Sequence, residues 1–391
     1  MKEKIIRIEL IPVHVPFREA VRKAMQSGEG GLGMAIGAEE EWEGGDFVIC
    51  KLITDEGNIG LGESYVWLPE TGISPNQIID SIQNSLSKYL LGENPFNIEK
   101  INYRMDINVA RTNVAKGLLD IACYDLMGKI SGLSVCNLIG GETTDEIPLA
   151  ALISLADVDY MIDMAKKLWK LGYKSFRYKL GKSIYDDIKI SEGLRNLLGQ
   201  DIRLRVDYNQ VYRPDEAVKA IKAIEQYNID FAEQPVNIND FLGMAYVQSR
   251  VNIPLMAHEG FFTMYDFVNL VEMGAVRVLG LNTERPGGIT KALKCLHYAE
   301  LRGLSTVIHN QNLGIGTATL LHFAAANYNS LGHTPELFGY AMMEDDLIIE
   351  KIQQENGIAK VPKGPGFGVK LDEKALERYS TGPTITIKSK N

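Results

Sequence analysis

The sequence predicts an α/β protein, a (β/α)7β TIM-like barrel preceded by a small α+β domain, and three observations support this prediction. After Gly141, short apolar strands alternate with helical segments, as expected for parallel strands joined by helical crossovers. Roughly eight such units follow one another, which is the number that closes a barrel. Nearly every strand ends on a polar residue, and in a barrel these ends meet at one mouth. An open doubly wound sheet is the alternative, but no GxGxxG motif follows the first strand.

Residues 1–140 are expected to form the α+β domain. Residues 4–15 and 46–54 alternate between apolar and polar side chains, which is typical of strands. Between them, a segment of about residues 18–45 is rich in Gly and Glu and has no period, so we interpret it as a mobile lid. From 75 to 139 the apolar residues recur with helical spacing.

Composition narrows the class of partner. The net charge of −9 and the lack of a Lys/Arg-rich run argue against nucleic acid. Four scattered cysteines give neither a zinc motif nor a disulfide framework, and no apolar run approaches the length of a membrane span. The N-terminus alternates like a strand and does not resemble a signal peptide. We therefore expect a soluble, cytoplasmic protein whose partner is a small molecule.

Seven strand-end polar residues in the barrel region are spaced 23 to 28 residues apart, about one strand and one helix each. Even spacing of this kind predicts a ring of side chains around one cavity. The ring consists of Lys179, Asp207, Glu233, Glu259, Asn282, His309 and Glu336.

Three members of this ring, Asp207, Glu233 and Glu259, follow successive strands and should be neighbours. Unpaired carboxylates at such short range would repel one another, and Mg²⁺ removes the repulsion with ligands that it prefers. For a single acid, capping of a helix or pairing with a lysine would be the better interpretation. Three at consecutive strand ends favour the metal.

Arg177 and Lys179 lie on one face of the strand in "FRYKLG" and are expected to point into the mouth, with Lys179 as a general base. The alternative is a pair of surface cations bonded to nearby acids. His309 is the candidate acid, although a lone histidine is more often a satisfied core residue. His258 should face away from the mouth and support the ligands from behind.

Several motifs resemble those of the mandelate racemase and muconate lactonizing enzyme branch of the enolase superfamily: "FRYKLG", "RVDYNQ", "FAEQP", "IPLMAHEG" and "RPGGIT". The resemblance implies a cap over residues 1–140, a barrel over 141–345, and a C-terminal segment, 346–391, that packs back on the cap. It also implies one Mg²⁺ on the three acids, Asn209 at the substrate, and a homo-oligomer. Enolase-superfamily enzymes use a Lys or His base with Mg²⁺ that stabilises an enediolate.

One position departs from the family pattern. Asn282 stands where the racemase pattern has Asp and the lactonizing and epimerase pattern has Lys, which disfavours two-base racemisation. With Lys179 as base, His309 as acid, Arg177 in the mouth and Glu336 bonded to the substrate carboxylate, we expect a lyase, an acid-sugar dehydratase of carbohydrate acid catabolism giving a 2-keto-3-deoxy acid. The alternative is an isomerase, either a racemase/epimerase or a cycloisomerase. A non-catalytic, metal-bearing relative is a further alternative.

The cap is expected to supply the remaining substrate contacts. Arg18, Arg22 and Lys23 precede the lid and could meet a distal carboxylate or hydroxyl groups of a sugar acid, while Tyr65 and Trp67 could wall the cavity. The alternative is that the lid charges are simply solvated.

Overall fold

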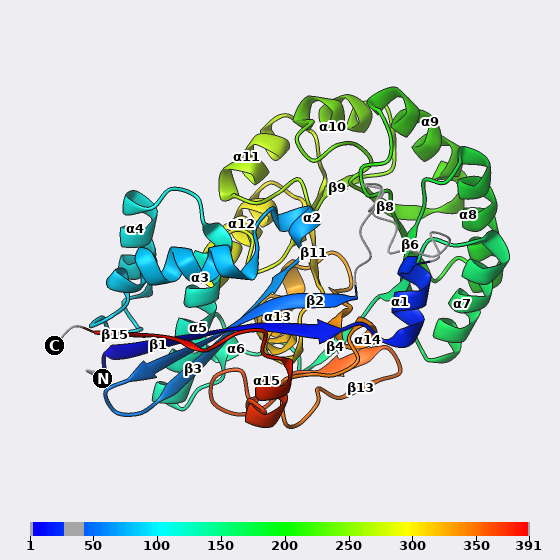
Figure 1. Cartoon of the computed structure of the whole chain (residues 1–391). Helices are drawn as coiled ribbons and strands as arrows, with labels where there is room; N and C mark the ends of the chain where they lie inside the picture. The colour runs from blue at the N-terminus through cyan, green and yellow to red at the C-terminus, as the bar shows by residue number, and fades with distance from the viewer. Residues whose placement is uncertain (1–2, 27–42, 390–391) are drawn as a thin grey trace.

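The computed structural model describes residues 3–26 and 43–389, and the predicted lid lies largely outside the described residues (Figure 1). Two bodies share the chain, a barrel and a cap beside it. The predicted fold class is confirmed, whereas the domain boundaries at 140 and 345 stay predictions.

Eight parallel strands form the barrel wall in strict sequence order, each paired with the next. The N–H of Ala150 donates to the carbonyl of Pro335 at 2.9 Å, which joins the flanks of the first and last strands and nearly closes the sheet. The strands are β5 (Ala151–Ile153), β6 (Ser175–Lys179), β7 (Arg203–Asp207), β8 (Ile229–Glu233), β9 (Leu255–Ala257), β10 (Val278–Leu281), β11 (Ser305–Asn310) and β12 (Glu336–Leu337).

Seven helices cross over between these strands and cover the outside of the wall (Figure 1). Local signals begin several of them: the Ser183 side chain caps one helix, and Thr263 forms a capping box with Asp266 at another. The crossovers are α7 (Val158–Lys170), α8 (Ile184–Leu198), α9 (Pro214–Ile224), α10 (Phe241–Gln248), α11 (Met264–Glu272), α12 (Ile289–Leu301) and α13 (Gly314–Ala326).

The predicted first barrel strand, "IPLAALIS", is divided in the structure. Its first part, β4 (Glu146–Pro148), pairs with β14 (Ile358–Lys360), which in turn pairs with β13 (Gln354–Glu355). Only β5 enters the barrel. Sequence alone cannot show this division, because the partner strands lie about 200 residues away in the chain.

A four-stranded antiparallel sheet forms the cap, in the order β15–β1–β2–β3. The C-terminal strand therefore completes a sheet begun by the N-terminus, as Figure 1 shows where red β15 lies along blue β1. The strands are β1 (Ile5–Pro16), β2 (Gly44–Thr54), β3 (Ile59–Val66) and β15 (Ile385–Lys388).

Helices α3 (Pro75–Asn84), α4 (Ile98–Asn108) and α5 (Asn113–Ser131) accompany this sheet, and α5 is buried along most of its length. Two glycines of β3 allow α5 to approach. A Cβ on Gly60 would lie 2.4 Å from the carbonyl oxygen of Ala122, and one on Gly62 would lie 2.7 Å from that of Leu118. Any larger residue would push the helix off the sheet.

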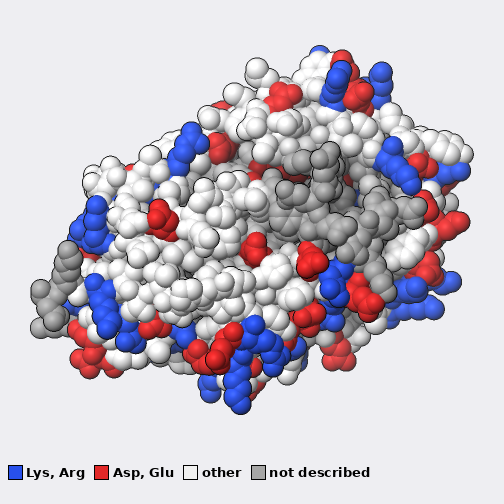
Figure 2. Space-filling view, viewed as in Figure 1, with Lys and Arg blue, Asp and Glu red and all other residues white. Residues whose placement is uncertain are grey.

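Helix α15 (Glu373–Tyr379) ties the C-terminal segment to the cap, because the Nζ of Lys51 in β2 lies 2.7 Å from a carboxylate oxygen of Glu373. Basic and acidic side chains are mixed along this edge of the molecule (Figure 2). Among the described residues, no helix is long and apolar enough to cross a membrane.

Glu63, in β3, links the cap to the barrel and predicts a pH effect on stability. Its carboxylate accepts the backbone N–H groups of Leu313 and Gly316, at 2.6 and 3.1 Å. Burial nevertheless raises the pKa of Glu63 from 4.5 to about 8. A raised folded-state pKa contributes stability that is complete below pH 4.5 and is lost as the pH rises to about 8.

We expect the free energy of unfolding to fall more steeply with rising pH in the wild type than in Glu63→Gln. The difference should approach about 1.4 kcal/mol per pH unit between the two pKa values. Urea unfolding at several pH values between 5 and 9 measures it, with Glu377→Gln on the exposed face of α15 as control. Parallel curves for wild type and Glu63→Gln would contradict the prediction.

Candidate active site

The structure brings the predicted ring together at the C-terminal mouth of the barrel. Lys179, Asp207 and Glu233 are the last residues of β6, β7 and β8. Asn282 directly follows β10, and Glu259 follows β9 by two residues. His309 and Glu336 lie in β11 and β12. All seven side chains are buried.

Arg177 binds carboxylates of its own barrel. Its Nε donates to Glu233 Oε2 at 2.8 Å, and its Nη2 donates both to Glu233 Oε1 at 2.9 Å and to Asp207. Its Nε also lies 3.3 Å from Glu336 Oε2. Burial works to lower the pKa of Arg177, but these three carboxylates outweigh it and raise that pKa. The guanidinium is therefore a fixed positive charge inside the mouth.

Lys179 contacts the same acid from the other side. Its Nζ donates to Asp207 Oδ2 at 2.7 Å and also to the Oδ1 of Asn209. The Nδ2 of Asn209 in turn donates to Glu259 Oε1 at 3.3 Å. Asn209 thus connects the candidate base on β6 to the acid that follows β9. The backbone of Asn209 has φ +41°, in the left-handed region that Asn tolerates better than most residues.

The pKa values of the three predicted metal ligands are shifted in different directions. Burial, followed by the charge of Glu233, raises the pKa of Asp207. Burial also works to raise the pKa of Glu233 and of Glu259, but positive groups reverse the shift in both: Arg177 and then His258 for Glu233, and His258 for Glu259. Glu233 and Glu259 are therefore anionic at neutral pH.

His258 corrects one prediction from the sequence. It was expected to face away from the mouth, but its Nδ1 lies 3.3 Å from Glu233 Oε1 and 3.4 Å from Glu259 Oε2. Burial and then Arg285 work to lower its pKa, and the close contacts with the two carboxylates reverse this and raise it. The imidazole therefore sits between two of the predicted ligands.

His309 lies against His258, with ring centroids 3.9 Å apart at 74°. Both of its ring nitrogens are buried, and neither has a hydrogen-bond partner among the described residues. Burial, and then the positive charge of His258 and Arg177, hold the pKa of His309 well below 6.5. His309 is therefore a neutral imidazole, and one of its ring nitrogens can accept a proton or a hydrogen bond. Its Nε2 lies 3.6 Å from Glu336 Oε2.

The donor set suits a hard divalent cation. Asp207 and Glu233 share the guanidinium of Arg177, and Glu233 and Glu259 share the imidazole of His258. The buried Oε2 of Glu259 has no hydrogen-bond partner among the described residues. Mg²⁺ prefers oxygen ligands of this kind. The residues present therefore fit Mg²⁺, with Arg177 and Lys179 as close positive neighbours.

Asn282 does not bond to His309. Its Oδ1 accepts the backbone N–H of Arg285 at 2.9 Å, so it shapes the loop after β10. Arg285 donates to the carbonyl of His258 at 2.9 Å and pairs with Glu70 of the cap, in α2 (Leu68–Thr71). A small pocket between cap and barrel is lined by Tyr65, Trp67 and Asn282 among others, so these two aromatic residues do reach the ring.

The three cations near the lid are placed differently. Arg18 donates to the carbonyl of Tyr340 at 3.0 Å and lines a separate cavity of about 130 Å³, bordered by Asn312 and Asp346. Arg22 lies in α1 (Glu19–Gln26). The side chain of Lys23 is outside the described residues, and the roles of all three stay predictions.

Sequence reasoning missed Arg205 and Arg285. The Nε of Arg205 lies 2.6 Å from Glu336 Oε1, and Arg205 precedes Asp207 by two residues in β7. Because side chains alternate between the two faces of a strand, Arg205 and Asp207 lie on the same inner face. The sequence therefore did allow Arg205 to be predicted in the barrel interior. Arg285 offered no such signal, because it lies in a loop.

Two family descriptions match most of the chain. "Mandelate racemase / muconate lactonizing enzyme, N-terminal domain" matches residues 31–140, and "Enolase C-terminal domain-like" matches residues 160–375. The chain is 32% identical over 334 residues to N-succinyl-L-Arg/Lys racemase of Bacillus cereus, with 85% of this chain and 90% of the relative covered.

Two solved structures that match this chain are of the same kinds of enzyme. The dipeptide epimerase of Enterococcus faecalis V583, crystallised with Mg and the dipeptide L-Leu-L-Tyr, has a TM-score of 0.83 and 31% identity, covering 94% of this chain and 99% of that one. Muconate cycloisomerase of Pseudomonas fluorescens has a TM-score of 0.85 and 27% identity, covering 97% and 99%. These relatives are racemases, epimerases and cycloisomerases. They support the isomerase alternative and give the expected sugar-acid dehydratase no support.

Proposed function

Because this chain belongs to the mandelate racemase and muconate lactonizing enzyme family, we propose that it is a Mg²⁺-dependent isomerase of a small carboxylic acid. The reaction is proton transfer at the carbon next to the substrate carboxylate. The observation that carries the proposal is the pair of proton-transfer groups in one mouth, Lys179 on β6 and His309 on β11, beside three acids that suit the metal.

Lys179 is the proposed base on one face of the substrate. It is held by Asp207 and Asn209, so its amine has a defined position at the mouth. When bound, Mg²⁺ supplies positive charge where the substrate carboxylate becomes more negative. Arg177 adds a fixed positive charge, and Glu336 contributes a carboxyl group whose pKa is raised by burial.

His309 is the proposed proton carrier on the other face. Its neutral ring can accept a proton, and once protonated it gives the proton up readily because its pKa is low. Burial keeps bulk water from competing for the same proton. Transfer between Lys179 and His309 across the substrate would invert one carbon centre.

The proposed substrates are N-acylated amino acids or dipeptides, the compounds named for the racemase and epimerase relatives. The pocket between cap and barrel offers both kinds of contact that such a substrate needs. Tyr65 and Trp67 stack with centroids 6.2 Å apart on one side, and polar residues, among them Asn282 and Arg285, line the rest.

A substrate panel in D₂O tests the proposal. Purified protein with Mg²⁺ is incubated with N-acyl amino acids, dipeptides and C5 and C6 sugar acids, and proton NMR follows the hydrogen at the α carbon. Exchange of that hydrogen with inversion, in the amino-acid class, is the expected result. A 2-keto product from a sugar acid without inversion of any substrate would overturn the isomerase proposal.

A one-base isomerisation is the second candidate, and Asn282 favours it. No carboxylate at this position raises the basicity of His309, because Asn282 is neutral and bonds to the Arg285 backbone. In that case Lys179 alone would remove and return the proton, and the planar substrate would have to turn over between the two steps for the carbon centre to invert.

His309→Gln separates the two candidates. If both residues transfer protons, the variant should still exchange the α hydrogen of one stereoisomer, through Lys179, and should lose inversion by about 10²-fold or more. His297→Gln, on the exposed side of α12, is the control. Inversion at the wild-type rate in His309→Gln would exclude the two-base mechanism and leave the one-base candidate.

A further inference from the structure

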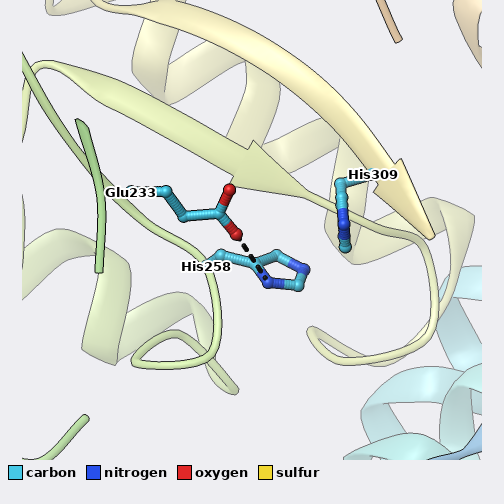
Figure 3. A group of neighbouring side chains, drawn as sticks. All are labelled: Glu233, His258 and His309. Carbon is cyan, nitrogen blue, oxygen red and sulfur yellow. Dashed lines mark ion pairs between the residues drawn. The ribbon is translucent and has the colours of Figure 1, made fainter. Parts of the chain in front are cut away.

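Three buried side chains in the mouth form a cluster of mixed chemistry. Glu233 ends β8, His258 follows β9 and His309 lies in β11, and Figure 3 shows the three groups turned toward one another. One ligand atom from each residue lies within 4.8 Å of the other two. His258 Nδ1 lies 3.3 Å from Glu233 Oε1, and the imidazole rings of His258 and His309 have centroids 3.9 Å apart.

Imidazole nitrogens in this cluster lack partners. Among the described residues, neither nitrogen of His309 nor the Nε2 of His258 has a hydrogen bond, although both side chains are only 2% exposed. A buried polar atom without a partner costs roughly 1–3 kcal/mol, so such atoms call for an explanation. A bound cation would accept the lone pair that each neutral imidazole carries on one of its nitrogens.

From this geometry we propose that Glu233, His258 and His309 form a cation site with two nitrogen ligands and one oxygen ligand, suited to a transition metal such as Co²⁺, Zn²⁺ or Fe²⁺. Imidazole is a good ligand for these ions, whereas Mg²⁺ prefers oxygen. Three protein ligands would leave further coordination positions open. The site shares Glu233 with the acids proposed for Mg²⁺ and His309 with the proposed proton transfer. Its existence does not depend on the isomerase reaction, but a transition metal bound there would inhibit that reaction.

Nearby charges are compatible with such an ion. Glu259 Oε2 lies 3.4 Å from His258 Nδ1, and Glu336 Oε2 lies 3.6 Å from His309 Nε2, so each imidazole has an acid beside it. Two arginines are also close: Arg285 donates to the carbonyl of His258 at 2.9 Å, and Arg177 donates to both carboxylate oxygens of Glu233, so the ion would share Glu233 with a guanidinium. A divalent ion would therefore lie in a mouth rich in carboxylates.

Cobalt binding tests the proposal without any measurement of turnover. Protein freed of metal with EDTA is titrated with Co²⁺, followed by visible absorption, and X-ray absorption then identifies the atoms around the ion. The wild type should show two imidazole nitrogens per Co²⁺. A shell of oxygen atoms alone would overturn the proposal, and this measurement needs no variant to fold.

Matched histidine variants give the second reading. His258→Gln and His309→Gln should each remove one imidazole from the Co²⁺ spectrum and weaken Co²⁺ binding by at least about tenfold. His297→Gln removes a histidine outside the mouth and should bind as the wild type does. Calorimetry should show that His309→Gln loses less affinity for Mg²⁺ than for Co²⁺. Equal Co²⁺ affinity in all three variants would overturn the proposal.

Discussion

Lys179→Met is expected to lower turnover by about 10³-fold, because the proposed base is lost. The epimerase pattern has a lysine where this chain has Asn282, so no second lysine at that position can replace the base. Methionine has a similar length, so the barrel packing should persist. Asp207 keeps its bond to Arg177 in the variant, and the acids proposed for Mg²⁺ stay in place. The loss should therefore appear in kcat, while Mg²⁺ binding measured by calorimetry stays close to that of the wild type.

Lys182→Met is the matched control. Lys182 lies three residues further along the chain, and its side chain is 53% exposed and paired with Asp157 at the surface. Its replacement should leave turnover unchanged. Proton exchange in D₂O gives a more specific test. Lys179→Met should lose α-hydrogen exchange for the stereoisomer from which Lys179 removes the proton. If Lys179→Met keeps more than a tenth of wild-type turnover, Lys179 is not the base.

The barrel and most of the ring could be predicted because the signals are local. A strand and the helix after it repeat every 23 to 28 residues, and the last residue of each strand then falls at the mouth. Two-residue alternation also places Arg177 and Lys179 on the same inner face. Neither prediction depends on which residues meet across the barrel.

His258 shows where this reasoning stops. The prediction that it faces away from the mouth assumed that the strand continues to Glu259, but β9 ends at Ala257. Both residues lie in the following loop, where alternation no longer sets direction. The ion pair between Arg205 and Glu336 was missed for a different reason, because it spans the barrel interior from β7 to β12. The position of Arg18 depends on the path of the chain around Tyr340.

Arg177→Met is expected to be the most destabilising of the substitutions considered. Arg177 is 2% exposed and contacts Asp207, Glu233 and Glu336, which are all fully buried. Removing one partner of a buried ion pair leaves uncompensated charge and costs about 3–5 kcal/mol. Urea unfolding in EDTA measures this loss directly, and Arg177→Lys should lose less because it keeps a positive charge.

Arg203→Met, on the same sheet, is the control for Arg177→Met. Arg203 has a side chain 49% exposed and pairs with Asp230 at 2.7 Å, and exposed pairs contribute roughly 0–1 kcal/mol. Adding Mg²⁺ gives a second test, because a ligand that binds only the folded state stabilises it. With Arg177 removed, Asp207 and Glu233 depend more strongly on the metal, so Mg²⁺ should raise the stability of Arg177→Met more than that of the wild type. Equal losses in the Arg177 and Arg203 variants, with equal responses to Mg²⁺, would mean that Arg177 does not hold the buried acids together.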